Sequence, residues 1–233
     1  MICFIDYRAT EEEIINLINL GCDPIKVPKC CDVYDAINGH VDIQLNIIDK
    51  LNKHIIVQKH IPKDFLNILK LNGIKYTLSK EELGKFYPSN IMLNALILEN
   101  YFVHNLNYTD ENLIKNQGSK ISVNVNQGYT KCSVLPIGNN AIITNDKGIY
   151  KTMTKENMDV LLIPPGDILL PSLDYGFIGG TGGMISENKL ALFGQLEHYC
   201  FGNDIYKFLY KYDIEAIPLK RGKLVDRGSL LTL

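Results

Sequence analysis

The residues best suited to chemistry in this sequence are Cys132, His40 and Asp42. A cysteine thiolate is a strong nucleophile, and a histidine can accept and deliver protons near neutral pH. Asp42 lies two positions after His40, so in an extended strand the two side chains would share a face. The carboxylate could therefore orient or hold the imidazole. We predict Cys132, His40 and Asp42 as catalytic residues.

Each of these residues also has a purely structural interpretation. Cys132 could be a small apolar core residue, and His40 could be a loop histidine that bonds to backbone or solvent. Lys131 comes directly before Cys132, and its positive charge could favour the thiolate. The sequence alone leaves both interpretations open.

A second group of polar residues stands in the loops between predicted strands and helices. Loops gathered at one end of a fold often build a binding site, and a carboxylate there could receive a cationic group. We predict that Asp6, Glu197 and His198 bind substrate. The alternative is that these loops are polar only for capping and solvation. The remaining members of the group are Arg8, Gln58, His60, His104, Asn105, Asn145, Asp146 and Gln195.

A glycine-rich run covers residues 176–183. It lacks the Gly-x-Gly-x-x-Gly spacing and the Lys-Ser/Thr ending of nucleotide-binding loops, and it precedes a strand instead of a helix. Close approach of the backbone to a neighbour or a small ligand explains it better. We therefore add Gly180 to the predicted substrate-binding residues.

Five predicted helices, spaced by about 50 residues, must position these side chains. Thr10, Thr109, Thr154 and Asn203 are predicted N-caps, and Pro62 suits a first helical turn. Thr10 and Glu13 form a capping box. The predicted helices cover residues 11–20, 63–71, 110–116, 155–158 and 204–212.

A strand and then an apolar hairpin are predicted to follow each helix. The strands after the helices cover residues 23–27, 74–78, 120–124, 160–163 and 214–219. The inner hairpin strands cover residues 41–48, 91–98, 132–137, 184–185 and 230–233, and their partners cover 54–58, 101–104, 141–144 and 190–193. The last hairpin lacks its second strand, which residues 2–5 at the N-terminus could supply.

The pattern predicts a single domain, residues 1–233, made of five helix–strand–hairpin units. The approximate units are 6–60, 61–106, 107–147, 148–197 and 198–233, closed by the strand 2–5. Pairing of the two chain ends would leave no exposed sheet edge. An ordinary open α/β sheet is the alternative, but the repeated hairpins and the lack of a long parallel run argue against it.

Composition excludes several classes of protein. Hydrophobic residues make up 46% of the 233 residues, charged residues make up 21%, and the net charge is −2. A disordered chain would be less apolar, and a nucleic-acid-binding protein would usually be basic. No signal peptide and no membrane span are visible. The six cysteines form no Cys-x-x-Cys pair, so we predict no metal site and a reducing, cytoplasmic location.

The five-unit pattern resembles the pentein fold, also called the guanidino-group-modifying fold. Gly39-His40-Val41-Asp42 is similar to the His-x-Asp motif that carries the catalytic histidine of pentein enzymes. The stretch from Gln127 to Leu135 is similar to the glycine-containing segment that carries their nucleophilic cysteine. The resemblance implies an α+β, pentein-type closed α/β propeller, as in arginine deiminases, dimethylarginine dimethylaminohydrolases, agmatine deiminases and amidinotransferases.

The resemblance also implies a function. It implies a hydrolase or deiminase in which Cys132 attacks a guanidinium carbon, His40 moves protons, and Asp42 with Glu197 holds the cation. No cofactor is implied; the partner is a small guanidino or cationic molecule, and a homo-oligomer is compatible with the pattern. However, family members carry the cysteine in the last unit, where this divergent sequence has none. A non-catalytic protein that binds a ligand or another protein, as in some family members, is therefore the alternative.

Overall fold

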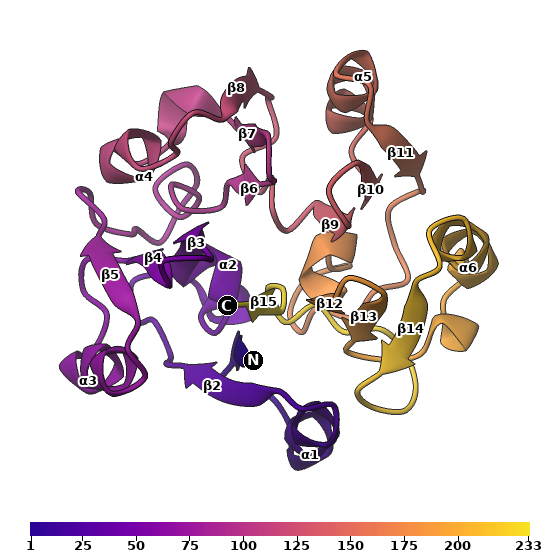
Figure 1. Ribbon diagram of the computed structural model, residues 1–233, viewed down its shortest axis with the longest axis horizontal. Coiled ribbons are helices and arrows are strands. Elements are labelled where there is room, and N and C mark those ends of the chain that lie inside the picture. The colour runs from indigo at the N-terminus through magenta and orange to yellow at the C-terminus, as the bar shows by residue number, and fades with distance from the viewer.

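Five small β-sheets of three strands each make up most of the regular structure (Figure 1). The computed structural model describes residues 1–233. In every sheet the middle strand pairs antiparallel with an inner strand and parallel with an outer strand. The sheets lie around a common centre with the inner strands toward it. The strand orders are β15-β1-β2, β3-β4-β5, β6-β7-β8, β9-β10-β11 and β12-β13-β14.

The strands are short and lie close to the predicted positions. They are β1 (Ile2–Asp6), β2 (Asp23–Val27), β3 (Leu45–Asp49), β4 (His54–Val57), β5 (Lys75–Leu78), β6 (Leu96–Ile97), β7 (Tyr101–His104), β8 (Ile121–Asn124), β9 (Val134–Ile137), β10 (Ala141–Thr144), β11 (Asp159–Leu162), β12 (Gly182–Ser186), β13 (Lys189–Leu192), β14 (Glu215–Pro218) and β15 (Leu231–Thr232). Each sheet takes its hairpin from one predicted unit and its outer strand from the next, so neighbouring units share a sheet.

Helices connect the middle strand of a sheet to its outer strand and lie at the periphery in Figure 1. They are α1 (Glu11–Asn19), α3 (Lys63–Leu71), α4 (Glu111–Lys115), α5 (Lys147–Lys155) and α6 (Gly202–Tyr210). A further helix, α2 (Val41–Gln44), lies near the centre. Four short 3₁₀ helices are η1 (Asp35–Ile37), η2 (Leu106–Tyr108), η3 (Ile178–Thr181) and η4 (Leu196–His198).

Local capping signals account for some helix starts and not for others. The capping box of Thr10 and Glu13 is confirmed at α1. The predicted helix over 155–158 is wrong, because α5 begins at Lys147 with Asp146 as its N-cap. The predicted caps Thr109 and Asn203 are also wrong, since Asp110 caps α4 and Phe201 precedes α6.

The first sheet is built from both ends of the chain. Strand β1 pairs with β15 antiparallel and with β2 parallel, as predicted for residues 2–5. The backbone amide of Ile2 donates to the carbonyl of Leu233 at 3.1 Å, and that of Leu233 donates to Ile2 at 2.9 Å. The N-terminal strand is therefore paired along both edges.

Apolar side chains fill the spaces between neighbouring sheets in five separate clusters. Each cluster combines buried residues from two adjacent sheets, so every sheet packs against two others. Representative pairs within one cluster are Phe4 and Val57, Ile56 and Phe102, Val103 and Ile142, Ile143 and Leu192, and Phe193 and Ile5. Polar side chains occupy the region where the segments before the inner strands meet.

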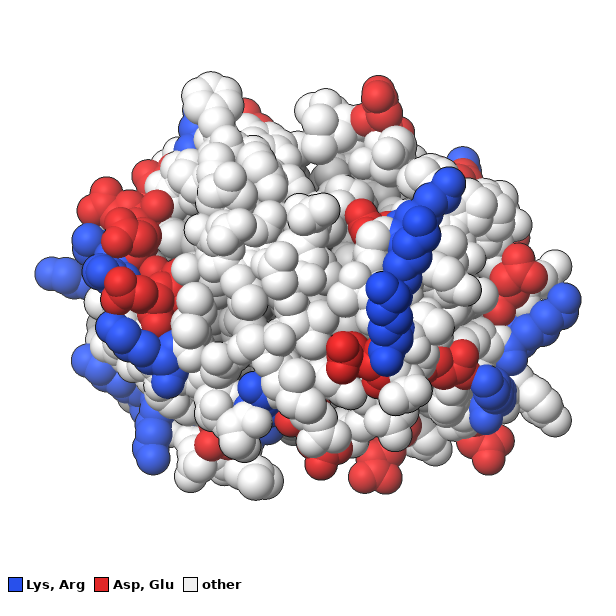
Figure 2. All heavy atoms as spheres, turned by 90° about the horizontal axis from the view of Figure 1, so that it is seen from above, with Lys and Arg blue, Asp and Glu red and all other residues white.

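The surface over α4 and α5 carries its charges unevenly. In Figure 2, a broad uncharged area lies left of the middle of this face, with charged side chains at both sides of the molecule and a row of Lys or Arg to the right of that area. None of the helices has the length and apolar character that crossing a membrane would require.

Candidate functional site

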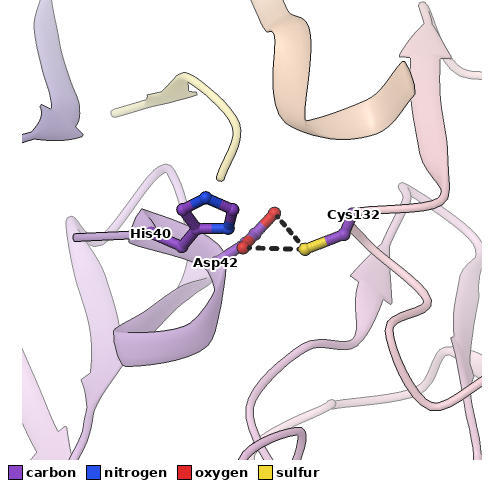
Figure 3. A group of neighbouring side chains, drawn as sticks. All are labelled: His40, Asp42 and Cys132. Carbon is purple, nitrogen blue, oxygen red and sulfur yellow. Dashed lines mark hydrogen bonds between the residues drawn. The ribbon is translucent and has the colours of Figure 1, made fainter. Parts of the chain in front are cut away.

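The structure brings the three predicted catalytic side chains together at the centre of the molecule (Figure 3). His40 lies directly before α2, Asp42 lies in that helix, and Cys132 lies just before β9. One nitrogen, one oxygen and the sulfur of these residues lie within 4.8 Å of one another. Because α2 is a helix, the strand geometry predicted to place His40 and Asp42 on one face is wrong.

The thiol of Cys132 contacts a carboxylate and an amide. Its Sγ lies 3.1 and 3.2 Å from the two carboxylate oxygens of Asp42, to which it donates a hydrogen bond. The Nδ2 of Asn94 donates to Sγ at 3.3 Å, and the backbone amide of Cys132 donates to Asn94 Oδ1 at 3.2 Å. Asn94 thus fixes both the backbone and the side chain of Cys132.

Burial keeps this thiol protonated in the resting structure. Cys132 is 2% exposed and Asp42 is 0% exposed. Burial raises the pKa of the Cys132 thiol well above its usual range, and the charges of Asp42 and Asp226 raise it further. Burial also raises the pKa of Asp42. A positive charge brought beside Sγ would favour the thiolate.

Neither ring nitrogen of His40 has a hydrogen-bond partner, although the residue is 1% exposed. Its Nε2 lies 3.7 Å from Asp226 Oδ1, which is too long for a hydrogen bond. Burial lowers the pKa of His40 to about 4, so the imidazole is neutral at neutral pH. The neutral ring has a free nitrogen to accept a proton, but its lowered pKa makes it a weak base until a bound cation also lowers the pKa of the thiol.

Two further charged residues belong to this central cluster. Lys131 donates from Nζ to Ser229 Oγ at 2.8 Å, and the Ser229 hydroxyl lies 2.6 Å from Asp42 Oδ2. Asp226 accepts from the backbone amides of Phe177 and Gly228 at 2.8 and 2.9 Å. Burial raises the pKa of Asp226 to about 6.

The sequence-based prediction did not include Asn94, Asp226 or Ser229. All three lie in the segment just before an inner strand, as His40, Asp42 and Cys132 do. A comparison of the polar residues just before each inner strand would have found them, because in each unit this segment lies at the centre of the molecule.

The predicted binding residues divide into two groups. Asp6 is fully buried beside Gly39 and is ion-paired with Arg8, and Gly180 packs against Asp226. A Cβ on Gly180 would lie 1.8 Å from Asp226 Oδ1, so the close approach predicted for this glycine is present. Glu197 and His198 are exposed in η4, where Glu197 accepts from the hydroxyl of Tyr206 in α6 at 2.8 Å. The structure does not bring Glu197 and His198 to the cluster.

The cluster offers three donor atoms to a metal ion, although the sequence predicts none. The nitrogen, oxygen and sulfur of His40, Asp42 and Cys132 form a set that suits Zn²⁺. The buried ammonium of Lys131 contributes to the electrostatics of both Asp42 and Cys132, and its charge opposes a dication there.

A cavity of about 1050 Å³ lies on the hairpin side of the molecule. Its lining includes Asn46, Gly183, Leu230 and the buried Lys131, but none of His40, Asp42 and Cys132. Lys131 therefore stands between this cavity and the cluster.

Two solved structures resemble this chain in fold. An amidinotransferase of the saxitoxin biosynthetic pathway from Microseira wollei, SxtG, is 9% identical with a TM-score of 0.58, and the match covers 97% of this chain and 89% of that chain. The inosamine-phosphate amidinotransferase StrB1 from Streptomyces griseus is 11% identical with a TM-score of 0.54, and the match covers 90% and 74%. Together with the five three-stranded sheets, these likenesses agree with a pentein-like fold.

Sequence comparison identifies the family. A search of curated proteins gave no significant match. A family model described as a family of unknown function, DUF6873, matches residues 4–231. Because this match spans nearly the whole chain, the protein belongs to the DUF6873 family.

Proposed function

We propose that this protein is a cysteine-dependent enzyme that modifies a guanidino group at the central cluster. The observation that carries the proposal is the convergence of His40, Asp42 and Cys132, which lie up to 92 positions apart in the chain yet within 4.8 Å in space. Similarity in fold to two amidinotransferases supports the general kind of activity. The substrate is a small guanidino compound, and no organic cofactor is required.

We also propose that the five sheets form a closed propeller in one domain, with the cluster at its pore. Support comes from the pairing of β1 with β15 and from the five apolar clusters, each shared by two neighbouring sheets. Six free cysteines favour a cytoplasmic location.

The reaction would begin when the guanidinium displaces the contact between Cys132 and Asp42. The two buried carboxylates, Asp42 and Asp226, hold the planar cation, since charge-assisted hydrogen bonds are strong in a buried site. The cation also lowers the pKa of the adjacent thiol. His40 then accepts the thiol proton.

The covalent step forms a bond between Sγ and the guanidinium carbon. The bond from that carbon to one nitrogen breaks as His40 returns its proton to the leaving ammonia or amine. Water then attacks the same carbon, the carbon–sulfur bond breaks, and the thiol is restored. The net reaction is hydrolysis of one carbon–nitrogen bond.

A turnover and trapping experiment tests this proposal. The protein is incubated with a panel of guanidino compounds, release of ammonia or amine is measured, and the peptide containing Cys132 is analysed by mass spectrometry after acid quench. We expect turnover and an adduct on Cys132, and a loss of about 10³-fold or more in Cys132→Ser. The matched control Cys200→Ser, at an exposed cysteine, should keep full activity.

The second candidate is a non-catalytic binding protein. The burial of the Cys132 thiol and its raised pKa favour this candidate. It predicts that guanidino compounds raise the melting temperature of the wild type and of Cys132→Ser alike, without product release and without an adduct. That combination of results would overturn the enzymatic proposal.

A further inference from the structure

A row of aromatic rings leads from the surface toward the central cluster. Neighbouring ring centroids are 6.1 Å apart for Tyr108 and Tyr87, 6.1 Å for Tyr87 and Tyr129, and 6.2 Å for Tyr129 and Phe177. These are ordinary separations for interacting aromatic rings. We call Tyr87, Tyr108, Tyr129 and Phe177 the aromatic row.

The inner half of the row is attached to the cluster through the backbone. Tyr129 lies three positions before Cys132, and its carbonyl accepts from the amide of Ser133 at 3.0 Å. The amide of Phe177 donates to Asp226 Oδ2 at 2.8 Å. A ligand group at this end of the row would therefore lie close to the thiol and the buried carboxylates.

The outer half of the row is open to solvent. Tyr87 is 51% exposed and Tyr108 is 44% exposed, whereas Tyr129 and Phe177 are half-buried. The row thus runs from the outside toward the cluster, with Tyr87 packed over Gly128 and against the rings of Tyr108 and Tyr129.

Two arginines near the cluster contact carboxylates of the protein. Arg8 donates from Nε and Nη2 to Asp6, and from Nη1 to the carbonyls of Asp35 and Ala36. The Nη2 of Arg227 lies 3.4 Å from both carboxylate oxygens of Glu13. The Nε of Arg227 is nevertheless buried without a hydrogen-bond partner, and the buried Nζ of Lys131 donates only to Ser229 Oγ and to two backbone carbonyls, so positive charge remains available near the cluster.

We propose that the substrate is a guanidino compound with an aromatic or apolar tail. Its guanidinium lies at Asp42 and Asp226, and its tail lies along the aromatic row against Tyr87. This inference names the substrate class of the proposed function and rests on it. Aromatic stacking supplies the affinity for the tail.

Calorimetric titration of the whole protein tests this proposal without relying on turnover. The probes are 2-phenylethylguanidine, butylguanidine, methylguanidine and arginine. We expect phenylethylguanidine to bind about tenfold more tightly than arginine. Tyr87→Ala should weaken phenylethylguanidine about tenfold and leave methylguanidine unchanged, and Tyr87→Leu, which keeps apolar bulk, should show a smaller loss. Tyr210→Ala, which removes an 84% exposed tyrosine from α6, is the matched control.

The outcomes separate this inference from the proposed function. Tight phenylethylguanidine binding without turnover supports the aromatic row as the site of the tail and contradicts the enzyme. Turnover of arginine with affinity equal to that of phenylethylguanidine supports the enzyme and overturns the substrate class. An unchanged phenylethylguanidine affinity in Tyr87→Ala, or no binding of any probe, also overturns it.

Discussion

The central cluster and the surface of α4 contain the same types of charged residue in opposite surroundings. At the surface, Glu111 accepts from Lys80 at 2.7 Å and from Lys115 at 2.8 Å, and these hydrogen bonds lower its pKa to about 2. At the centre, burial raises the pKa of Asp226 to about 6. Hydrogen-bond partners therefore set the pKa of the carboxylate at the surface, whereas the loss of water sets the pKa of the carboxylate at the centre.

The two regions also differ in how far their contacts depend on one another. The surface group is one carboxylate between two lysines, and solvent can replace either partner. At the centre, Lys131, Ser229, Asp42, Cys132 and Asn94 form one chain of hydrogen bonds shielded from solvent. Removal of one member leaves the others buried without a partner.

The largest expected effect is on Lys131. Lys131→Met should lower the free energy of unfolding by about 3–5 kcal/mol at neutral pH, because Asp42 and Asp226 stay buried without a cation. Urea denaturation measures this change. Lys115→Met on α4 is the matched surface variant and should unfold at nearly the same urea concentration as the wild type. Equal urea midpoints for Lys131→Met and Lys115→Met would show that the buried residues at the centre do not depend on one another for stability.

A smaller loss is expected from added bulk at the centre. Gly180→Ala places a Cβ 1.8 Å from Asp226 Oδ1, and overpacking of this kind costs about 1–3 kcal/mol. Lys151→Ala at an exposed position of α5 is the control, because alanine is a strong helix former and this variant should be unchanged or slightly more stable. In thermal unfolding, the melting temperature of Gly180→Ala should therefore fall, whereas that of the control variant should stay the same or rise slightly.

The pH dependence of stability should reveal Asp226 directly. In the folded protein the pKa of Asp226, about 6, lies above its usual value near 4, so the folded state holds this proton and the contribution of Asp226 to stability falls as pH rises from 4 to 6. The pKa values of His40 and His104 are lowered to about 4, so their contributions rise over the same range. These slopes oppose one another in the wild type.

Asp226→Asn removes the falling contribution of Asp226 and leaves that of Asp42, whose pKa burial also raises. Its stability should therefore rise more steeply between pH 4 and 6 than that of the wild type, as measured by urea midpoints across this range. Asp204→Asn, at an exposed position of α6, is the matched control and should follow the wild-type profile. A parallel profile for Asp226→Asn would mean that Asp226 carries no shifted pKa.

The smallest effect is expected at the predicted binding residue that lies apart from the cluster. Glu197→Gln should leave the affinity for guanidino compounds unchanged in calorimetric titration, because Glu197 is exposed and contacts Tyr206. A tenfold loss of affinity would show that η4 takes part in binding and would remove the contrast between the centre and the rim.

Much of the fold was predictable because its signals are local. The capping box at Thr10 and the apolar hairpin strands depend on residues a few positions apart. Helix α2 was missed because Val41 and Ile43 alternate with polar residues and so resemble a strand. Helix α5 gives a weak signal because it is largely polar, and Thr154 near its end resembles an N-cap.

The central cluster could be predicted only in part because its contacts are long-range. Asn94 and Cys132 are 38 positions apart, and Asp42 and Ser229 are 187 positions apart. The chemistry of cysteine and histidine marks such residues in a sequence, whereas an asparagine, a serine or a second aspartate is marked only by the neighbours that the fold provides. Burial, which sets their pKa values, is likewise a property of the assembled sheets.

The pairing of β1 with β15 has a consequence for the order of folding. Of the strands described, β1 is synthesised first and its partner β15 last, so the edge of β1 that binds β15 stays open until synthesis of the chain has reached Leu231 and Thr232. Asp226 and Ser229 are synthesised just before β15, so the cluster cannot form completely until this part of the chain has been made. During this interval β1 offers an unpaired edge to other chains. Folding of such a long-range pairing is expected to be slow, and newly made chains would be the form of this protein most prone to aggregate.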